Sequence, residues 1–153
     1  MKLDLGSGDA PCEGYTTVDY YNPAADIDAP LWDLPYADGT AEEIRCFHAL
    51  EHVPAARVAP TLLEWWRVLA PGRRLRVEVP DLDWVCRRWL ENPDTDGLNY
   101  IFGNQADEGQ FHQTGFVEKT LRAALSEAGF IEISIESVWS HAAECLRAEG
   151  WKR

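Results

Sequence analysis

The sequence predicts one α/β domain built on a single sheet, and three observations support this prediction. Short apolar runs alternate with longer stretches of helical periodicity, which is typical of α/β proteins. The first run leads into Gly6-Ser7-Gly8, and the second closes with Asp19, so a turn and an acid follow the first two runs. No repeat, low-complexity tract or linker interrupts the 153 residues, and this length suits one fold. We therefore expect a single domain over residues 1–153.

The expected strands are short and lie in both halves of the chain. Residues 75–79 give the clearest pattern and residues 25–27 the weakest. Residues 131–138 alternate with a period of two, which predicts a half-buried strand. Periodicity leaves residues 144–151 open between a final strand and a helix. The full set of expected strands is residues 3–5, 16–19, 25–27, 43–47, 75–79 and 131–138.

Apolar stripes at helical spacing predict three helices. Pro71-Gly72 should stop the first helix. Asp81 precedes the second, where its carboxylate can accept hydrogen bonds from free backbone N–H groups. Gly129 supplies a left-handed exit from the third. The expected helices are residues 58–69, 82–90 and 117–128.

The stretch between the second and third helices is rich in glycine, asparagine and aspartate. It runs over residues 92–115, which is long for an irregular connection in a compact domain. Such stretches usually carry function, so we expect a lid or substrate-binding loop there.

Composition excludes several functional classes. The chain has 26 acidic and 14 basic residues, and its net charge of −12 repels phosphate backbones, so nucleic acid is an unlikely partner. It lacks the long apolar run of a membrane span and, over residues 1–4, the start of a signal peptide. The widely spaced cysteines form no C-x-x-C and suggest reduced thiols in the cytoplasm. A nucleotide acceptor stays an alternative because arginines cluster at Arg67, Arg73, Arg74, Arg76, Arg87 and Arg88.

The glycine turn favours a ligand without phosphate groups. A dinucleotide fingerprint needs a third glycine, but Pro11 stands in its place. About seven residues separate Gly8 from the second strand, too few for a crossover helix whose N-terminus could hold a pyrophosphate. Asp4, inside the first strand, would repel phosphate and suits a ligand with an ammonium group. Asp19 can accept two hydrogen bonds from a ribose diol.

Six ordered motifs carry a family resemblance. They are Asp4-Leu5-Gly6-Ser7-Gly8, Gly14-Tyr15-Thr16-Thr17-Val18-Asp19, Asp33-Leu34-Pro35-Tyr36-Ala37-Asp38-Gly39-Thr40, His48-Ala49-Leu50-Glu51-His52-Val53, residues 66–75 and Val79-Pro80-Asp81. In this order the motifs resemble those of class I S-adenosylmethionine-dependent methyltransferases, and especially a small bacterial and phage branch. The resemblance covers most of residues 3–81 and resumes weakly at residues 111–116 and 127–130.

The resemblance implies a Rossmann-like, doubly wound and mostly parallel sheet of seven strands, with an antiparallel last strand and a shortened or absent first crossover helix. It also implies S-adenosylmethionine as cofactor. The glycines would pass under its methionine part, Asp19 would bind the ribose, and Leu31 with Trp32 would flank the adenine. Pro30 stands where the family often has an acid, so Asp28, Asp33 or the backbone is left to meet adenine N6. The expected cofactor-binding residues are Asp4, Gly6, Ser7, Gly8, Asp19, Tyr20, Leu31, Trp32, Phe47 and His48.

The expected reaction is methyl transfer to a hydroxyl group, for which a general base helps. His112, inside the expected lid, is the candidate base, and Asp81 is the second candidate, although helix capping competes for its carboxylate. The resemblance suggests a small-molecule or glycan-like acceptor. Tyr20, Tyr21 and Gln105 are candidate acceptor contacts, and a homodimer could complete the site.

Two other interpretations stay open at this point. His48-x-x-Glu51-His52 has the spacing of an inverted zinc-protease motif, although such a motif needs a continuous helix. Glu51, His52 and His112 could instead hold a divalent metal in a methyltransferase, but the sequence alone leads us to assign no metal ligand. A module that binds the cofactor without catalysis and partners another enzyme is the alternative from a different functional class.

Overall fold

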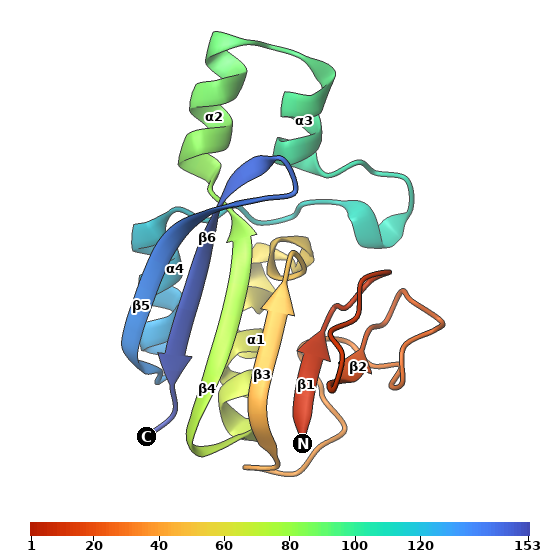
Figure 1. The fold of residues 1–153 in the computed structure, drawn as a ribbon, viewed down its shortest axis with the longest axis vertical. Coiled ribbons are helices and arrows are strands. Elements are labelled where there is room, and N and C mark those ends of the chain that lie inside the picture. The colour runs from red at the N-terminus through yellow and green to blue at the C-terminus, as the bar shows by residue number, and fades with distance from the viewer.

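The computed structural model describes residues 1–153 except for the side chain of Thr95. Its centre is a six-stranded sheet of order β2-β1-β3-β4-β6-β5 (Figure 1). The pairs β2–β1, β1–β3 and β3–β4 are parallel, whereas β6 is antiparallel to both β4 and β5. The strands are β1 (Lys2–Leu5), β2 (Thr16–Val18), β3 (Ala41–Phe47), β4 (Leu69–Pro80), β5 (Ile131–Ser140) and β6 (Ala143–Trp151). The antiparallel last strand is confirmed, and the segment that periodicity left open is a strand.

The expected count of seven strands is wrong, because residues 25–27 do not form a strand. They make one parallel bridge, between Val18 and Ile27. The carboxylate of Asp26 accepts hydrogen bonds from both the backbone N–H and the hydroxyl of Thr17, each at 2.9 Å. The Asp26 carboxylate thereby occupies the backbone N–H of Thr17, which a longer pairing of the two segments would use as a hydrogen-bond donor. The sheet therefore ends at β2 with a single bridged residue beside it.

The three expected helices are present, and a fourth lies in the stretch expected to be irregular. The helices are α1 (Ala55–Val68), α2 (Leu82–Glu91), α3 (Thr95–Phe102) and α4 (Glu118–Glu127), with 3₁₀ turns η1 (Leu50–His52) and η2 (Glu108–Gln110). Asp94 begins α3 by accepting a hydrogen bond from the N–H of Gly97 at 2.7 Å. No helix joins β1 to β2 in the described chain, which confirms the missing crossover helix. None of the described helices has the length and apolarity needed to cross a membrane.

The helical layer covers one face of the sheet. In Figure 1, α1 and α4 lie behind the sheet, and α2 with α3 stands beyond the end toward which β4 runs. Leucines and valines of β1 and β4, with Ile44 and Cys46 of β3, pack on that rear side against Leu62 and Trp65 of α1 and Leu121 of α4. Among the described residues, no helix covers the near face, because the connections from β1 to β2 and from β2 to β3 contain none.

Alternating charges cover the helix-free face instead. Because side chains alternate along a strand, the residues between the core positions point to the near side. There Asp4 pairs with Arg45 at 2.7 Å and Glu78 with Arg147 at 2.7 Å. The guanidinium groups of Arg45, Arg76 and Arg147 lie over the ring of Phe47. Ion pairs and cation–π contacts thus take the place of a second helical layer.

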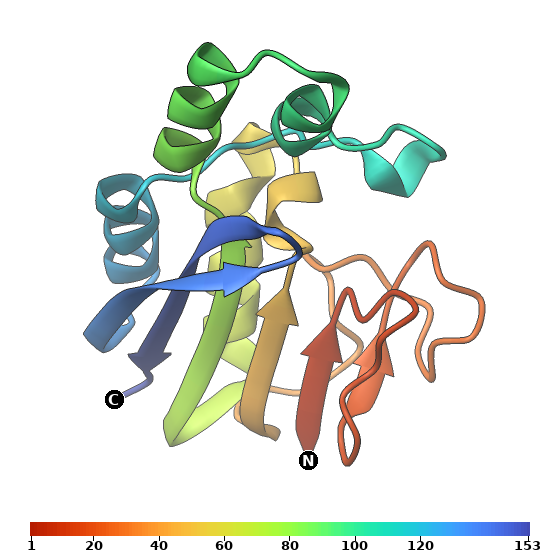
Figure 2. The ribbon, with the colours of Figure 1, turned by 45° about the horizontal axis from the view of Figure 1, so that its top comes forward.

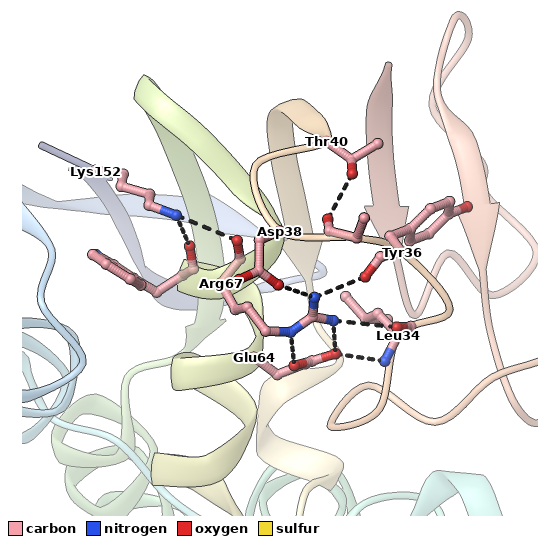
Figure 3. Close-up of polar contacts among 9 residues, drawn as sticks. Leu34, Tyr36, Asp38, Thr40, Glu64, Arg67 and Lys152 are labelled. Atoms are coloured by element: carbon pink, nitrogen blue, oxygen red, sulfur yellow. Dashed lines mark hydrogen bonds and ion pairs between the residues drawn. The ribbon is translucent and has the colours of Figure 1, made fainter.

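Five of the six arginines of the sequence cluster are paired with acids within the chain, whereas Arg73 is exposed. Arg67 binds Glu64 and Asp38, each at 2.7 Å, and also donates to the carbonyls of Leu34 and Tyr36 (Figure 3). Arg74 and Arg76 both contact Glu43 and Glu149, Arg87 contacts Asp83, and Arg88 contacts Asp94. These acids neutralise the charge of the five arginines, which could otherwise have attracted a nucleotide.

Candidate functional site

A cavity of about 400 Å³ lies where β1, β2 and β3 end. Its walls come from the loops that follow these three strands, from residues 30–32 and from residues 107–113. In Figure 2 the red and orange loops follow the upper ends of β1 and β2, and the teal segment that carries η2 lies above them. Open α/β sheets bind ligands outside the carboxyl ends of their strands, and this volume is in the range of small-molecule sites. The lining residues are Gly6, Gly8, Asp9, Asp19, Tyr20, Tyr21, Asn22, Pro23, Pro30, Leu31, Trp32, His48, Ala49, His52, Val53, Pro54, Asp107, Gly109, Gln110 and Gln113.

The turn after β1 requires glycine at its first position. Gly6 has φ +67°, and a Cβ added there would lie 2.2 Å from the Cβ of Ala49. The loop after β3 therefore approaches the main chain of this turn too closely for any other residue. Gly8 also has a positive φ, of +50°, and lines the cavity. The Ser7 hydroxyl is buried and has no hydrogen-bond partner.

Asp19 connects the two loops that form one wall of the cavity. Its Oδ2 accepts a hydrogen bond from the N–H of Gly8 at 3.0 Å. Its Oδ1 accepts from the N–H groups of Tyr21 at 2.9 Å and Asn22 at 3.1 Å. A carboxylate offers about four lone-pair positions, so these three hydrogen bonds leave about one acceptor position on Asp19, which lines the cavity. The side chain of Asn22 in turn donates to the carbonyl of Gly8.

Three residues expected at the cofactor, Asp4, Ser7 and Phe47, lie outside the cavity lining. Asp4 is 1% exposed and pairs with Arg45, while its Oδ2 accepts from the N–H of Cys12 at 2.9 Å. This contact fixes the far end of the glycine loop. Phe47 lies among guanidinium groups on the helix-free face. A side chain on a strand points to the face of the sheet that its position sets. The side chains of Asp4 and Phe47 therefore point to the helix-free face and not toward the cavity that the residues after each strand line.

The other expected cofactor residues do come together. Tyr20, Leu31, Trp32 and His48 all line the cavity. Trp32 is held from outside by the guanidinium of Arg57, which lies 4.7 Å from its ring centre. Trp65, on α1, donates its indole N–H to the carbonyl of Leu31 at 2.8 Å. The connection from β2 to β3 is therefore anchored on α1 although it contains no helix.

His48 lies between two buried carboxylates. Its Nε2 is 2.9 Å from Glu78 Oε1, and its Nδ1 is 3.6 Å from Glu51 Oε1. Burial lowers the pKa of His48, but the hydrogen bonds and charges of both glutamates outweigh burial and raise it to about 9. Burial likewise opposes ionisation of Glu78, yet hydrogen bonds from His48, Ser140 and Arg147 lower its pKa to about 2. His48 is thus a cation at neutral pH.

His112 packs against His52, which lines the cavity. The two imidazole rings meet edge to face at 4.8 Å, and His112 Nδ1 is 3.0 Å from the carbonyl of Tyr100. Burial is the largest influence on the His112 pKa and lowers it, so this ring is neutral at physiological pH. The neighbouring Gln113 lines the cavity, as does His52, whereas His112 itself does not.

Asp81 lies away from this cavity. Its carboxylate accepts from the N–H of Asp83 at 3.0 Å and so caps α2. Burial raises the pKa of Asp81. It lines a separate, open depression with Val117 and Arg122. Of the candidate acceptor contacts, Tyr20 and Tyr21 line the main cavity and Gln105 does not.

The geometry does not support a zinc-protease site at His48-x-x-Glu51-His52. His48 directly follows β3 and has φ +55°, and only the three-residue turn η1 carries Glu51 and His52. The two histidines face different partners, since His48 contacts Glu78 and His52 contacts His112. A protease of this kind needs both histidines on one face of a continuous helix.

Several residues of the cavity carried no sequence signal. Asn22 lines it from a loop without a motif, and Asp107, Gln110 and Gln113 line it from the expected lid, where no pattern singled out these three residues. The buried Glu78 gave no signal either, because an acid in an alternating strand normally indicates a solvated face. Only knowledge that β4 and β6 place Arg147 opposite Glu78 could have identified this pair.

Comparison with known proteins gives structural similarity without sequence similarity. No family model matches the sequence, and no curated protein matches it. A SAM-dependent methyltransferase from Thermotoga maritima superposes with a TM-score of 0.73 at 16% identity, covering 99% of this chain and 82% of that one. One from Methanosarcina mazei gives 0.68 at 16% identity, covering 99% and 91%.

A third similar structure contains ligands. It is the 1,6-didemethyltoxoflavin-N1-methyltransferase of Burkholderia thailandensis with bound 1,6-didemethyltoxoflavin and S-adenosylhomocysteine. Its TM-score is 0.67 at 15% identity, covering 99% of this chain and 70% of that one. At such identities the similarity concerns the fold. The chain therefore has the fold of the class I S-adenosylmethionine-dependent methyltransferases.

Proposed function

We propose that this chain is an S-adenosylmethionine-dependent methyltransferase. One observation carries the proposal: the glycine turn after β1 and the carboxylate after β2 form adjoining walls of one cavity at the carboxyl ends of the strands. This arrangement matches a nucleoside whose ribose meets an acid while the rest of the ligand passes close to bare main chain. The similar structures are SAM-dependent methyltransferases, which agrees with it.

The residues of the cavity divide among the parts of the cofactor. Asp19 accepts a hydrogen bond from a ribose hydroxyl with the acceptor position that the three backbone N–H groups leave on its carboxylate. Leu31 and Trp32 flank the adenine, and Gly6 and Gly8 allow the methionine part to lie against the turn. Asp4 acts indirectly, because its pairing with Arg45 and the N–H of Cys12 holds the loop in shape.

The acceptor enters beside His52, His112 and the segment 92–115, which we retain as the substrate-binding element. S-adenosylmethionine supplies an electrophilic methyl group on a positively charged sulfur. The chain aligns an acceptor hydroxyl with that group, and the neutral imidazole of His112 takes the hydroxyl proton at Nε2. Nδ1 is already committed to the carbonyl of Tyr100. A small-molecule or glycan-like acceptor fits the net charge of −12, which disfavours nucleic acid.

The free thiols fit a reducing compartment, and we place the protein in the cytoplasm. All four cysteines are unpaired in the structure: Cys12, Cys46, Cys86 and Cys145. Stable disulfides are rare in that compartment.

A second candidate is a module that binds the cofactor and serves another protein. The helix-free face of the sheet favours it, because that face could receive a partner or a second copy of the chain. Turnover by the isolated chain decides between the two candidates.

Calorimetric titration with S-adenosylmethionine and S-adenosylhomocysteine tests the proposal. We expect one molecule of either compound to bind per chain. Absence of heat with both compounds, for a protein that is folded by circular dichroism, would contradict it. With binding established, methyl transfer to a panel of hydroxylated small molecules and sugars follows. His112→Ala should then lower kcat at least 100-fold while cofactor affinity is retained.

A further inference from the structure

Three potential metal ligands meet beside the cavity. Glu51, His52 and His112 each offer one ligand atom, and these atoms lie within 4.8 Å of one another. We propose that Glu51, His52 and His112 bind a divalent transition-metal ion. This inference goes beyond the proposed function, and the binding of the metal does not depend on it.

The carboxylate of Glu51 is buried and incompletely satisfied. The residue is 2% exposed, and its Oε2 has no hydrogen-bond partner. A buried carboxylate oxygen without a partner is costly, so native structures rarely leave one without a reason. A bound cation beside the two imidazoles would satisfy it.

Both histidines have a free nitrogen suited to a metal. His52 Nδ1 lies 3.0 Å from the carbonyl of Phe111, and His112 Nδ1 lies 3.0 Å from the carbonyl of Tyr100. A carbonyl can only accept, so each Nδ1 carries the hydrogen and each Nε2 has the lone pair. Metal-binding histidines are commonly oriented in this way by a backbone carbonyl on the other ring nitrogen.

The backbone holds the two halves of the cluster together. The carbonyl of Glu51 accepts hydrogen bonds from the N–H groups of Gln113 at 2.8 Å and Thr114 at 3.0 Å. The side chain of Gln113 also donates to the carbonyl of His52 at 2.8 Å. Residues 51–53 and 111–114 are therefore fixed to each other, although about sixty positions separate them. A rigid arrangement of ligands favours metal binding.

The other group of potential ligands is already satisfied. His48, Glu78 and Cys145 also lie within 4.8 Å of one another. Glu78 Oε2, however, accepts from Arg147 at Nε and Nη2, and its Oε1 meets His48. The Cys145 thiol contacts the carbonyls of Ser140 and Ala143. We therefore use this group as the control.

Two imidazoles and one carboxylate suit zinc, iron, cobalt or manganese and leave coordination positions open. Because His52 lines the cavity, an acceptor hydroxyl could bind to an open position of the metal. A metal-bound hydroxyl would lose its proton to solvent more easily. This role rests on the proposed function. With the metal bound, this role of the metal replaces the direct proton transfer to His112, because Nε2 of His112 cannot both bind the metal and accept the proton.

The test is metal titration of the chain alone, without S-adenosylmethionine. Protein treated with EDTA and dialysed is titrated with zinc chloride by calorimetry and with cobalt chloride by visible absorption. We expect one equivalent of metal and a cobalt spectrum without thiolate bands. Glu51→Gln, His52→Gln and His112→Gln should each weaken binding at least 10- to 100-fold, the loss that an outer partner alone can cause. The matched controls are Cys145→Ala and His141→Gln, the latter at a histidine whose ring lies 4.1 Å from that of His48. Both should bind as the parent does.

Two results would overturn the proposal: no stoichiometric binding, or binding that survives all three ligand variants. Loss of binding in Cys145→Ala would do so too, because it would assign the metal to the other group. Circular dichroism accompanies each variant, and if buried Glu51→Gln does not fold, the partly exposed His52→Gln decides. S-adenosylhomocysteine is titrated separately, so failure of metal binding and failure of cofactor binding remain distinguishable.

Discussion

Asp19 illustrates how one side chain can organise a site. Its carboxylate accepts three backbone N–H groups, from Gly8, Tyr21 and Asn22. A glycine turn and an acid closing the next strand are local features, so the sequence predicted this part of the cavity. Asp4 and Phe47 are different, because what a strand residue contacts depends on which layer covers its face. No residue pattern indicated that this sheet has helices on one side only.

Asp19→Ala should weaken binding of S-adenosylhomocysteine by about 1–3 kcal/mol, because a ribose hydroxyl loses a partly buried acceptor. The variant also frees three N–H groups, so its thermal midpoint should be measured alongside the calorimetric affinity. Glu13→Ala removes an exposed carboxylate of a neighbouring loop and is the control, with unchanged affinity. An Asp19→Ala affinity equal to that of the parent would show that this carboxylate does not contact the ribose.

At the scale of elements, the end of α1 depends on a contact from the last residues of the chain. Lys152 is 8% exposed, and its Nζ donates to the carbonyls of Trp66 at 2.8 Å and Arg67 at 3.3 Å (Figure 3). These carbonyls belong to the last turn of α1, where a cation is favourable. The ammonium also lies 4.0 Å from the centre of the Trp66 ring. A lysine next to the C-terminal arginine gave no sign of this role.

Lys152→Met keeps the apolar stem and removes both hydrogen bonds. We expect the free energy of unfolding to fall by about 1–2 kcal/mol, as measured in urea. Lys119→Met on the exposed side of α4 is the control and should change stability by less than about 0.5 kcal/mol. Equal effects of the two substitutions would refute a specific contribution of Lys152.

The Glu64–Arg67 pair ties residues 34–38 to α1 and should make stability depend on pH. Arg67 binds both carboxylate oxygens of Glu64, and the N–H of Leu34 donates to the same group at 2.8 Å. Hydrogen bonds from Arg67 are the largest cause of the lowered pKa of Glu64. The stabilisation is therefore complete above the pKa of the unfolded state, near 4.3, and is lost as pH falls through the lower folded pKa.

Glu64→Gln should cost roughly 1–3 kcal/mol at pH 7, and the difference from the parent should shrink below about pH 4. Urea unfolding between pH 3 and 7 measures it. Glu118→Gln removes an exposed pair with Arg122 and should show a much smaller difference. A constant difference across this pH range would mean that ionisation of Glu64 does not contribute.

The elements differed in how well the sequence predicted them. Residues 75–79 and 131–138 have clear patterns and form strands within β4 and β5. Helix α3 was missed because its eight residues include Gly97 and Asn99, both poor helix formers, and its start depends on the Asp94 side chain. Residues 25–27 do not form the expected strand because the Asp26 carboxylate takes the backbone N–H of Thr17, which strand pairing would need.

At the scale of the whole molecule, we expect the bound cofactor to stabilise the folded state. The cavity joins segments from residues 6 to 113 that few helices support, so a ligand there should hold them together. S-adenosylhomocysteine at 100 times its Kd should add about 2.7 kcal/mol. For a chain of this size that corresponds to a rise in Tm of roughly 5–10 °C. Adenosine alone should give a smaller rise, and a flat response to both would contradict ligand binding by the folded state.

The mostly parallel sheet with its antiparallel last strand and the missing crossover helix followed from the resemblance, whereas the one-sided helical layer did not. The near face of the sheet is covered by charged pairs, and an acidic chain can satisfy such a face without a second layer. Charged residues that alternate with apolar ones, as in β3 and β4, normally indicate a solvated face. The partners that bury them come from strands distant in sequence.

The most direct test of the central claim is a crystal structure of the chain with S-adenosylhomocysteine. The account predicts a ribose hydroxyl within hydrogen-bond distance of the Asp19 carboxylate and the sulfur beside the turn at Gly6 and Gly8. The adenine should lie against Leu31 and Trp32. A ligand bound elsewhere, or a cavity still empty at saturating ligand, would contradict the account.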